Sequence, residues 1–149
     1  MNEGPVLVAG GGPVGVITAL ALAQRGIPVR VFEAAESVND APRASTLHPA
    51  TLEMLASVGL LDEIIARGLV ARTFQFWDRP TRSVVAEFDH AILENDTDYP
   101  FVVQCEQHKI ANLAVEKLRA FKHAGVTFSA PVTAISAGDD NVDITVAID

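Results

Sequence analysis

Cysteine is almost absent from this sequence of 149 residues. Its single cysteine, Cys105, cannot form a disulfide within the chain, which is typical of a reducing compartment, so we expect a cytoplasmic protein. Basic residues are also few: 11 lysines and arginines stand against 19 aspartates and glutamates, giving a formal net charge of -8. Because nucleic-acid binding needs a positively charged surface, no nucleic acid is expected as a partner.

An uninterrupted apolar segment of membrane-spanning length is missing as well. Residues 4–24 carry no charged side chain, but glycines and a proline interrupt them at positions 10–13 and 15. A membrane-spanning helix needs about 20 apolar residues in one segment. The first three residues lack the positive charges that open a signal peptide. We therefore expect no membrane partner.

The N-terminal region instead has the pattern of a βαβ unit. Residues 6–9 are a short apolar run ended by glycines, which predicts a strand buried on both faces, as in a parallel sheet. Residues 14–25 predict a helix that is apolar nearly all round and ends before Gly26. Residues 29–33 predict the second strand, and a right-handed crossover is expected between the two.

The remainder of the chain is predicted to be mixed α/β, beginning with a loop at residues 34–45. The patterns predict three helices, at residues 49–58, 61–67 and 106–123. They also predict strands at residues 72–78, 83–89, 100–104, 126–129, 132–136 and 142–148. The last of these alternates apolar and polar residues, as a half-solvated antiparallel strand does, after a turn at residues 138–141.

The sequence GGGPVG at residues 10–15 matches the pattern G-x-G-x-x-G. In that pattern Gly10 permits a tight turn, Gly12 lets the backbone approach a pyrophosphate, and Gly15 lets the helix pack close to the strand. Pro13 and Val14 open the helix, whose N-terminal N–H groups and partial positive charge favour phosphates. An ordinary glycine-rich turn is the alternative, but the predicted strand before the motif and helix after it favour a dinucleotide site.

Glu33 ends the second predicted strand, where dinucleotide-binding folds carry an acidic residue. Its carboxylate would accept hydrogen bonds from the adenosine ribose hydroxyls and would repel a 2′-phosphate, so NADP is not expected at this site. The alternative is a solvated carboxylate at a strand end. Spacing alone does not separate FAD from NAD.

Residues 6–33, PRASTLHPATLEML at 42–55 and QCEQ at 104–107 resemble the N-terminal part of the FAD-dependent aromatic hydroxylases. These are single-component flavoprotein monooxygenases related to p-hydroxybenzoate hydroxylase and 3-(3-hydroxyphenyl)propionate hydroxylase. The resemblance implies that Arg43 lies near the pyrophosphate or the nicotinamide approach, Gln104 near the ribityl chain, and Val132 near the adenine. A solvated arginine and an ordinary strand-end glutamine are the alternatives for the first two.

The resemblance also implies the fold class and the domain organisation. We expect a Rossmann-like FAD/NAD(P)-binding three-layer α/β fold, with a central parallel sheet and an antiparallel β-meander. Residues 1–149 would be the N-terminal part of the FAD-binding domain. Within them, the segment from about residue 70 to residue 103 would contribute strands to the start of a substrate-domain sheet. Two further flavin motifs of the family are not found here, and Gly138-Asp139 is not one of them because a strand follows it. The remainder of the enzyme is therefore expected to be absent from this chain, which alone would be inactive.

The function that the resemblance implies is hydroxylation of a small aromatic (phenolic) substrate. FAD would be the bound cofactor, NADH or NADPH the transient electron donor and O2 the second substrate, with the hard chemistry supplied by the cofactor. The sequence identifies no catalytic residue. No metal site is expected, because Cys105 and His108 lie three residues apart but the chain has no second such pair of potential ligands. The alternatives are a fragment of an NAD-dependent Rossmann oxidoreductase and a truncated nucleotide-binding module without turnover. A homodimer is a further expectation.

Overall fold

The computed structural model describes residues 4–41, 43–139 and 141–147. The chain divides into two compact units, one formed by Met1–Pro42 with Gln107–Asp149 and the other by Arg43–Glu106. In the described part of the chain, no helix has the length and apolar character needed to cross a membrane.

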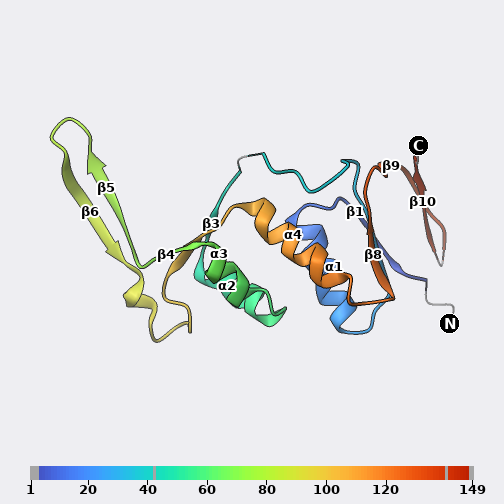
Figure 1. The fold of residues 1–149 in the computed structure, drawn as a ribbon, viewed down its shortest axis with the longest axis horizontal. Helices are drawn as coiled ribbons and strands as arrows, with labels where there is room; N and C mark the ends of the chain where they lie inside the picture. Colours follow the sequence, from blue (N-terminus) through green and yellow to red (C-terminus); the bar gives the residue numbers. More distant parts are fainter. Residues whose placement is uncertain (1–3, 42, 140, 148–149) are drawn as a thin grey trace. The chain divides into compact units, whose positions relative to one another are not determined.

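A parallel sheet with two helices forms the centre of the first unit. Its strands are β1 (Val6–Ala9), β2 (Val29–Phe32) and β8 (Ala124–Thr127), in the order β1-β2-β8. Both strand pairs are parallel, as the predicted βαβ unit requires. The helices α1 (Pro13–Gln24) and α4 (Gln107–Leu118) lie side by side on one face of this sheet (Figure 1).

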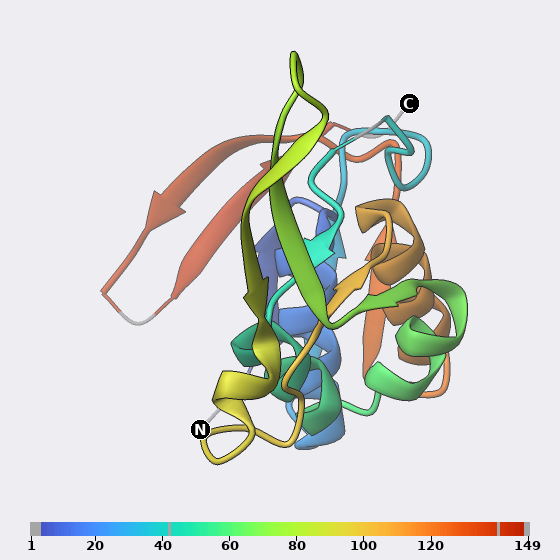
Figure 2. The ribbon, with the colours of Figure 1, turned by 90° about the vertical axis from the view of Figure 1, so that its left-hand side faces the viewer.

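An antiparallel hairpin lies on the other face. It consists of β9 (Val132–Ala137) and β10 (Val142–Val146), which form a twisted ribbon (Figure 2). Together with the sheet and the helices, it gives the predicted three layers. Of the predicted meander, the described residues contain this one hairpin. Ile148, the predicted end of its last strand, and Asp140 in its turn lie outside the described residues.

The core of the first unit is centred on β2, whose Val29 and Val31 are fully buried. The apolar helix α1 contributes buried side chains from successive turns: Val16, Ala19, Leu20 and Ala23. β1 differs from the prediction of a strand buried on both faces, because it lies at an edge of the three-stranded sheet. Its Val6 and Leu7 remain 41% and 36% exposed.

A short antiparallel sheet organises the second unit. Its central strand β7 (Val102–Gln104) lies between β3 (Thr46–Leu47) and β4 (Leu69–Ala71). The helices α2 (Pro49–Ser57) and α3 (Leu61–Arg67) contact each other, and α3 leads into β4. The buried side chains of this unit are Leu52, Leu55, Val58, Leu60, Leu61, Ile64, Val102, Val103 and Cys105.

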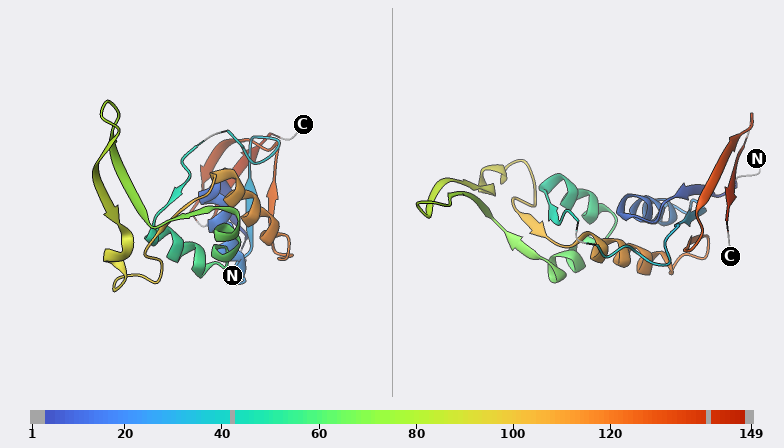
Figure 3. Two further views of the ribbon diagram at one scale, coloured as in Figure 1. Left: turned by 60° about the vertical axis from the view of Figure 1, so that its left-hand side comes forward. Right: turned by 90° about the horizontal axis from the view of Figure 1, so that it is seen from above.

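A two-stranded hairpin completes the second unit. It pairs β5 (Thr73–Asp78) with β6 (Ser83–Asp89), and the 3-10 helix η1 (His90–Leu93) follows (Figure 3). On one face the rings of Phe74 and Phe88 stack with centroids 4.8 Å apart. The assignment of residues 70–103 to a substrate-side sheet stays a prediction.

The predicted helix over residues 106–123 is too long. After Leu118, the N–H groups of three successive residues donate to carbonyls three residues earlier, as in Phe121 N–H to Leu118 O at 3.0 Å. The α-helix therefore ends before Gly125, because these N–H groups bond to the carbonyl three residues earlier instead of the carbonyl four residues earlier. The short strands β3 and β4 were not predicted.

Candidate functional site

The glycine-rich loop connects β1 to α1 at the carboxyl end of the parallel sheet. The N–H of Gly10 donates to the carbonyl of Phe32 at 2.7 Å, which extends the β1–β2 pairing by one residue. Helix α1 then starts at Pro13, with Gly12 as its N-cap. Ligands of open α/β sheets bind in the crevice outside the carboxyl ends of the strands. The motif therefore has the setting that was predicted for it.

Two glycines of the motif are required by the fold itself. Gly10 has φ of 106°, a left-handed conformation that residues with a side chain rarely adopt. A Cβ on Gly15 would lie 2.1 Å from the carbonyl oxygen of Gly10 and 3.3 Å from Cγ1 of Val8. Because the first of these atoms is backbone, it cannot rotate away. The missing side chain of Gly15 therefore allows the first turn of α1 to pack closely against the end of β1.

Gly12 is different, because neither its backbone nor its surroundings require a glycine. Its φ of -67° and ψ of 174° are extended values open to any residue. Apart from Gly12 itself and its two chain neighbours, an ideal Cβ built on it has no heavy atom of the described residues within 4 Å. The open side of Gly12 lies next to the N-terminus of α1, where backbone N–H groups and a partial positive charge attract anions.

The residues in the first turn of α1 are compatible with an anionic ligand. Pro13 occupies its first position, and the turn contains no acidic side chain. Val14 is 81% exposed beside the loop. Proline at this position removes one N–H that no carbonyl of the helix would have accepted, and its fixed φ is suited to the start of a helix.

Glu33 follows β2 directly, and its carboxylate is turned toward the glycine-rich loop. Oε2 accepts a hydrogen bond from the N–H of Gly11 at 2.5 Å. Oε1 accepts one from the N–H of Ala35 at 2.9 Å. The main chain of Glu33 is also fixed, since its N–H donates to Thr127 O and its C=O accepts from Ala130 N–H, both at 2.8 Å. An ionised carboxylate has about four acceptor positions, so lone pairs remain for ribose hydroxyls.

Gly11 was not among the predicted site residues, yet the structure gives it a specific role. It is buried, and a Cβ there would lie 2.9 Å from Cβ of Glu33. The only signal in the sequence was a third glycine at the variable position of the pattern. The close approach of Gly11 lets the Glu33 carboxylate reach the loop backbone.

Arg43 and Gln104 lie in the second unit. Arg43 is exposed, in the loop that leads into β3. Gln104 is half-buried at the end of β7, where its Oε1 accepts hydrogen bonds from Ser45 Oγ at 3.3 Å and Thr46 Oγ1 at 2.9 Å. Sequence reasoning did not identify these two hydroxyl residues. The roles of Arg43 and Gln104 toward a cofactor stay predictions.

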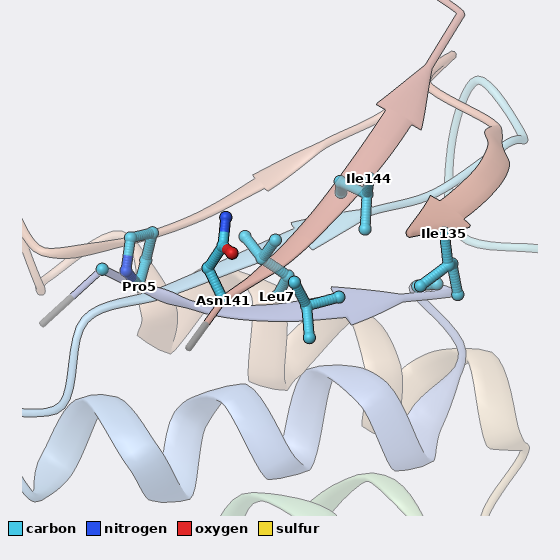
Figure 4. A pocket seen from close by; sticks show the side chains of 8 residues that line it. Pro5, Leu7, Ile135, Asn141 and Ile144 are labelled. Atoms are coloured by element: carbon cyan, nitrogen blue, oxygen red, sulfur yellow. The ribbon is translucent and has the colours of Figure 1, made fainter. Parts of the chain in front are cut away.

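Val132 lies in the first unit, where it begins β9 and pairs with Val146. An apolar groove of about 600 Å³ separates the hairpin from β1. Figure 4 shows Leu7 of β1 facing Ile135 and Ile144 of the hairpin across this groove, with α1 on the opposite side of β1. The expected role of Val132 near an adenine stays a prediction.

Two histidines contact backbone carbonyls, and the single cysteine is buried. The described residues contain no group of three or more potential metal ligands. His90 Nδ1 lies 2.8 Å from Arg72 O, and His123 Nε2 lies 3.0 Å from Ala23 O. Both histidine contacts are with backbone carbonyls. Cys105 is buried.

The strand, glycine-rich loop, helix and second strand, with a carboxylate at the end of that strand, define a dinucleotide-binding α/β domain. Comparison with known proteins narrows this class. A family model described as FAD binding domain matches residues 3–148, and the chain belongs to this family. The resemblance predicted from the sequence is confirmed.

Named relatives are monooxygenases. The chain is 35% identical to 6-hydroxy-3-succinoylpyridine 3-monooxygenase of Pseudomonas putida over 93% of its length, and 33% identical to para-nitrophenol 4-monooxygenase of a Pseudomonas species over 93%. The crystal structure of p-nitrophenol 4-monooxygenase from Pseudomonas putida superposes with a TM-score of 0.90 at 35% identity, covering 95% of this chain and 36% of that one.

The fold recurs at lower identity. A flavin-dependent monooxygenase solved in complex with FAD and substrate has a TM-score of 0.84 at 22% identity, over 95% of this chain and 26% of that chain. The chain spans about a third of the length of the two curated relatives named above, 35% and 34%.

Proposed function

We propose that residues 6–33 bind the ADP half of FAD. The diphosphate would lie over the open side of Gly12 at the N-terminus of α1, and the adenosine ribose would lie beside Glu33. Pro13 and Val14 would form the wall of this site, while Gly10 and Gly15 hold its shape.

The observation that carries this proposal is the glycine at position 12. Most residues could adopt its backbone conformation, and a Cβ there would have no described atom within 4 Å beyond its chain neighbours. An approaching ligand would account for a glycine at this position. The neighbouring helix terminus makes an anionic ligand the best match.

Glu33 favours a ribose without a 2′-phosphate. Its carboxylate is held 2.5 Å from the loop by the N–H of Gly11, so a second anion placed beside it would be repelled. FAD has free hydroxyls on its adenosine ribose and fits this requirement. The identity of the matching family supports FAD over NAD at this site.

We further propose that the longer protein is an NAD(P)H-dependent flavoprotein monooxygenase that hydroxylates a small aromatic substrate with O2. The names of the relatives support this, since they act on a hydroxylated pyridine and on a nitrophenol. FAD, when bound, would supply the redox chemistry. In this proposal Arg43 approaches the pyrophosphate, Gln104 the ribityl chain and Val132 the adenine. A cytoplasmic location and a homodimer belong to the same proposal.

The test is an absorbance spectrum of the purified chain, followed by mass analysis of any nucleotide that it releases and by titration with FAD, ADP and NAD. Flavin absorbance, or saturable binding of both FAD and ADP, is the expected result. Binding of NAD without FAD would instead favour a nicotinamide-dependent oxidoreductase. If no adenine nucleotide binds, the proposal is wrong.

A further inference from the structure

Three phenylalanine rings gather on the β5–β6 hairpin of the second unit. Phe74 and Phe88 lie opposite each other in the strand pair, and their rings stack with centroids 4.8 Å apart and planes 11° apart. The ring of Phe76 meets both of them edge-on, with centroids at 5.7 and 6.1 Å. Phe74 and Phe88 are nevertheless 45% and 49% exposed. The described residues therefore leave much of this aromatic surface uncovered.

A groove lies beside the stacked pair. Its volume is about 530 Å³, within the roughly 300–1,000 Å³ typical of small-molecule sites. Besides Phe74 and Phe88, its lining comes from the end of β6 and from η1, which follows that strand directly (Figure 1). The imidazole of His90 is tilted by 54° to the ring of Phe74, with centroids 5.7 Å apart. A planar ring in the groove would therefore have aromatic neighbours, with which rings pair favourably.

The imidazole of His90 is held in one tautomer by the backbone. Its Nδ1 lies 2.8 Å from the carbonyl oxygen of Arg72, and the main-chain N–H of His90 donates to the same oxygen at 2.9 Å. Because a carbonyl oxygen only accepts, Nδ1 carries the hydrogen. In the neutral ring Nε2 is then an acceptor, and among the described residues no donor to it is found. His90 thus brings to the groove a polar atom suited to a hydroxyl donor.

Two carboxylates determine the charge that the groove tolerates. Glu87 and Asp89 both belong to its lining. Asp89 accepts a hydrogen bond from the N–H of Ala91 at 2.9 Å, and Glu87 accepts one from Nε2 of Gln75. Both donors are neutral, so they leave the negative charges in place. Since like charges repel, an anionic ligand is disfavoured here and a neutral ring is favoured.

We propose that this groove binds the ring of a neutral phenol, which packs against Phe74 and Phe88 and donates its hydroxyl hydrogen to Nε2 of His90. This rests on the proposed function, which assigns a phenolic substrate to the longer protein. It adds the residues that recognise the ring and the charge state in which the ligand binds. All the contacts lie within the second unit, so the groove can be tested separately from the nucleotide site.

The test titrates the chain with phenol, anisole and benzoate and follows the phenylalanine and histidine ring signals by NMR. A pH of about 8 is used, above the range in which histidine usually takes up a proton. Saturable binding of phenol is expected. Anisole has the same ring but no hydroxyl donor, and it should bind about threefold to tenfold more weakly, as for one neutral hydrogen bond. Benzoate, which is an anion, should bind more weakly than phenol.

Two substitutions separate the hydrogen bond from the ring contacts. His90→Asn keeps a side-chain donor for the carbonyl of Arg72 but has no acceptor in place of Nε2, so it should bind phenol and anisole equally. Phe88→Leu keeps an apolar side chain but removes one ring of the stacked pair. It should weaken phenol and anisole alike, by about threefold to tenfold. Trp77→Leu is the control, because it removes an exposed aromatic ring of the same hairpin that does not line the groove.

Three results would overturn the proposal. One is equal affinity of the unsubstituted chain for phenol and anisole, and another is benzoate binding as tight as that of phenol. The third is a lack of saturable phenol binding, including the case in which copies of the chain associate through this face and fill the groove. Equal losses in Trp77→Leu and Phe88→Leu would also contradict it. Failure of the chain to bind FAD and ADP would instead refute the proposed nucleotide site, on which the phenol titration does not depend.

Discussion

The N–H of Gly11 donates a hydrogen bond to Oε2 of Glu33 at 2.5 Å, which joins the glycine-rich loop to the end of the second strand. The pair connects two parts of the proposed ribose and phosphate site. Because the donor is backbone and the acceptor is charged, the bond belongs to the stronger class of hydrogen bonds. It fixes the carboxylate on the side where a ribose would lie.

Gly12→Val should weaken nucleotide binding without destabilising the fold. The Cβ of the valine would meet no described atom within 4 Å outside Gly12 and its chain neighbours, and the side chain would fill the space proposed for the diphosphate. We expect ADP affinity to fall at least tenfold, or about 1.4 kcal/mol. Calorimetric titration measures the affinity and urea unfolding the stability. Gly4→Val is the matched control, since its Cβ also meets nothing and it lies outside the loop. Equal ADP affinity in the two variants would contradict the site.

Gly15→Ala, unlike Gly12→Val, should lower the stability of the fold. Its Cβ would lie 2.1 Å from the carbonyl oxygen of Gly10, so the helix must move away from the strand. We expect the free energy of unfolding to fall by about 1–3 kcal/mol, the usual cost of overpacking. Urea denaturation followed by circular dichroism measures this. A variant as stable as the parent would show that α1 does not depend on this close approach.

Gly11→Ala tests the contact with Glu33. The added Cβ would lie 2.9 Å from Cβ of Glu33, so the loop and the carboxylate must separate. We expect a loss of stability of about 1–3 kcal/mol together with weaker ADP binding. Urea denaturation measures the stability, and calorimetric titration measures the ADP affinity. Stability loss with unchanged ADP affinity would mean that the loop position does not affect the ribose site.

Glu33→Ala should weaken ADP binding by ~1–2 kcal/mol, the usual size for a lost hydrogen bond to a charged group. It should also reduce the preference for ADP over 2′-phospho-ADP, because the repelling charge is gone. Calorimetric titration with both ligands measures this preference. Glu36→Ala removes an exposed carboxylate from the following loop and serves as the control. A preference that stays the same in Glu33→Ala would exclude the carboxylate as the cause.

Local signals explain why much of the fold could be predicted. Helix α3 begins and ends where predicted, at Leu61–Arg67, because glycines at positions 59 and 68 stand on either side of it. The turn between β5 and β6 lies at residues 79–82, between the predicted strands 72–78 and 83–89, where Pro80 favours a turn. The strands β3 and β4 could not be predicted, because two or three residues form a strand only through pairing with β7. That pairing depends on residues far away in the chain.

The sequence by itself determined the βαβ unit and the glycine motif, since backbone conformation, helix starts and apolar runs are set by residues close together in the chain. Tertiary structure decided which groups meet: Glu33 reaches Gly11 across 22 residues, and Thr46 reaches Gln104 across 58. It also separated the glycines that folding requires from Gly12, which has open space around it. The physical reason is that a hydrogen bond or a close approach depends on positions in space, which only the packed sheet and helices fix.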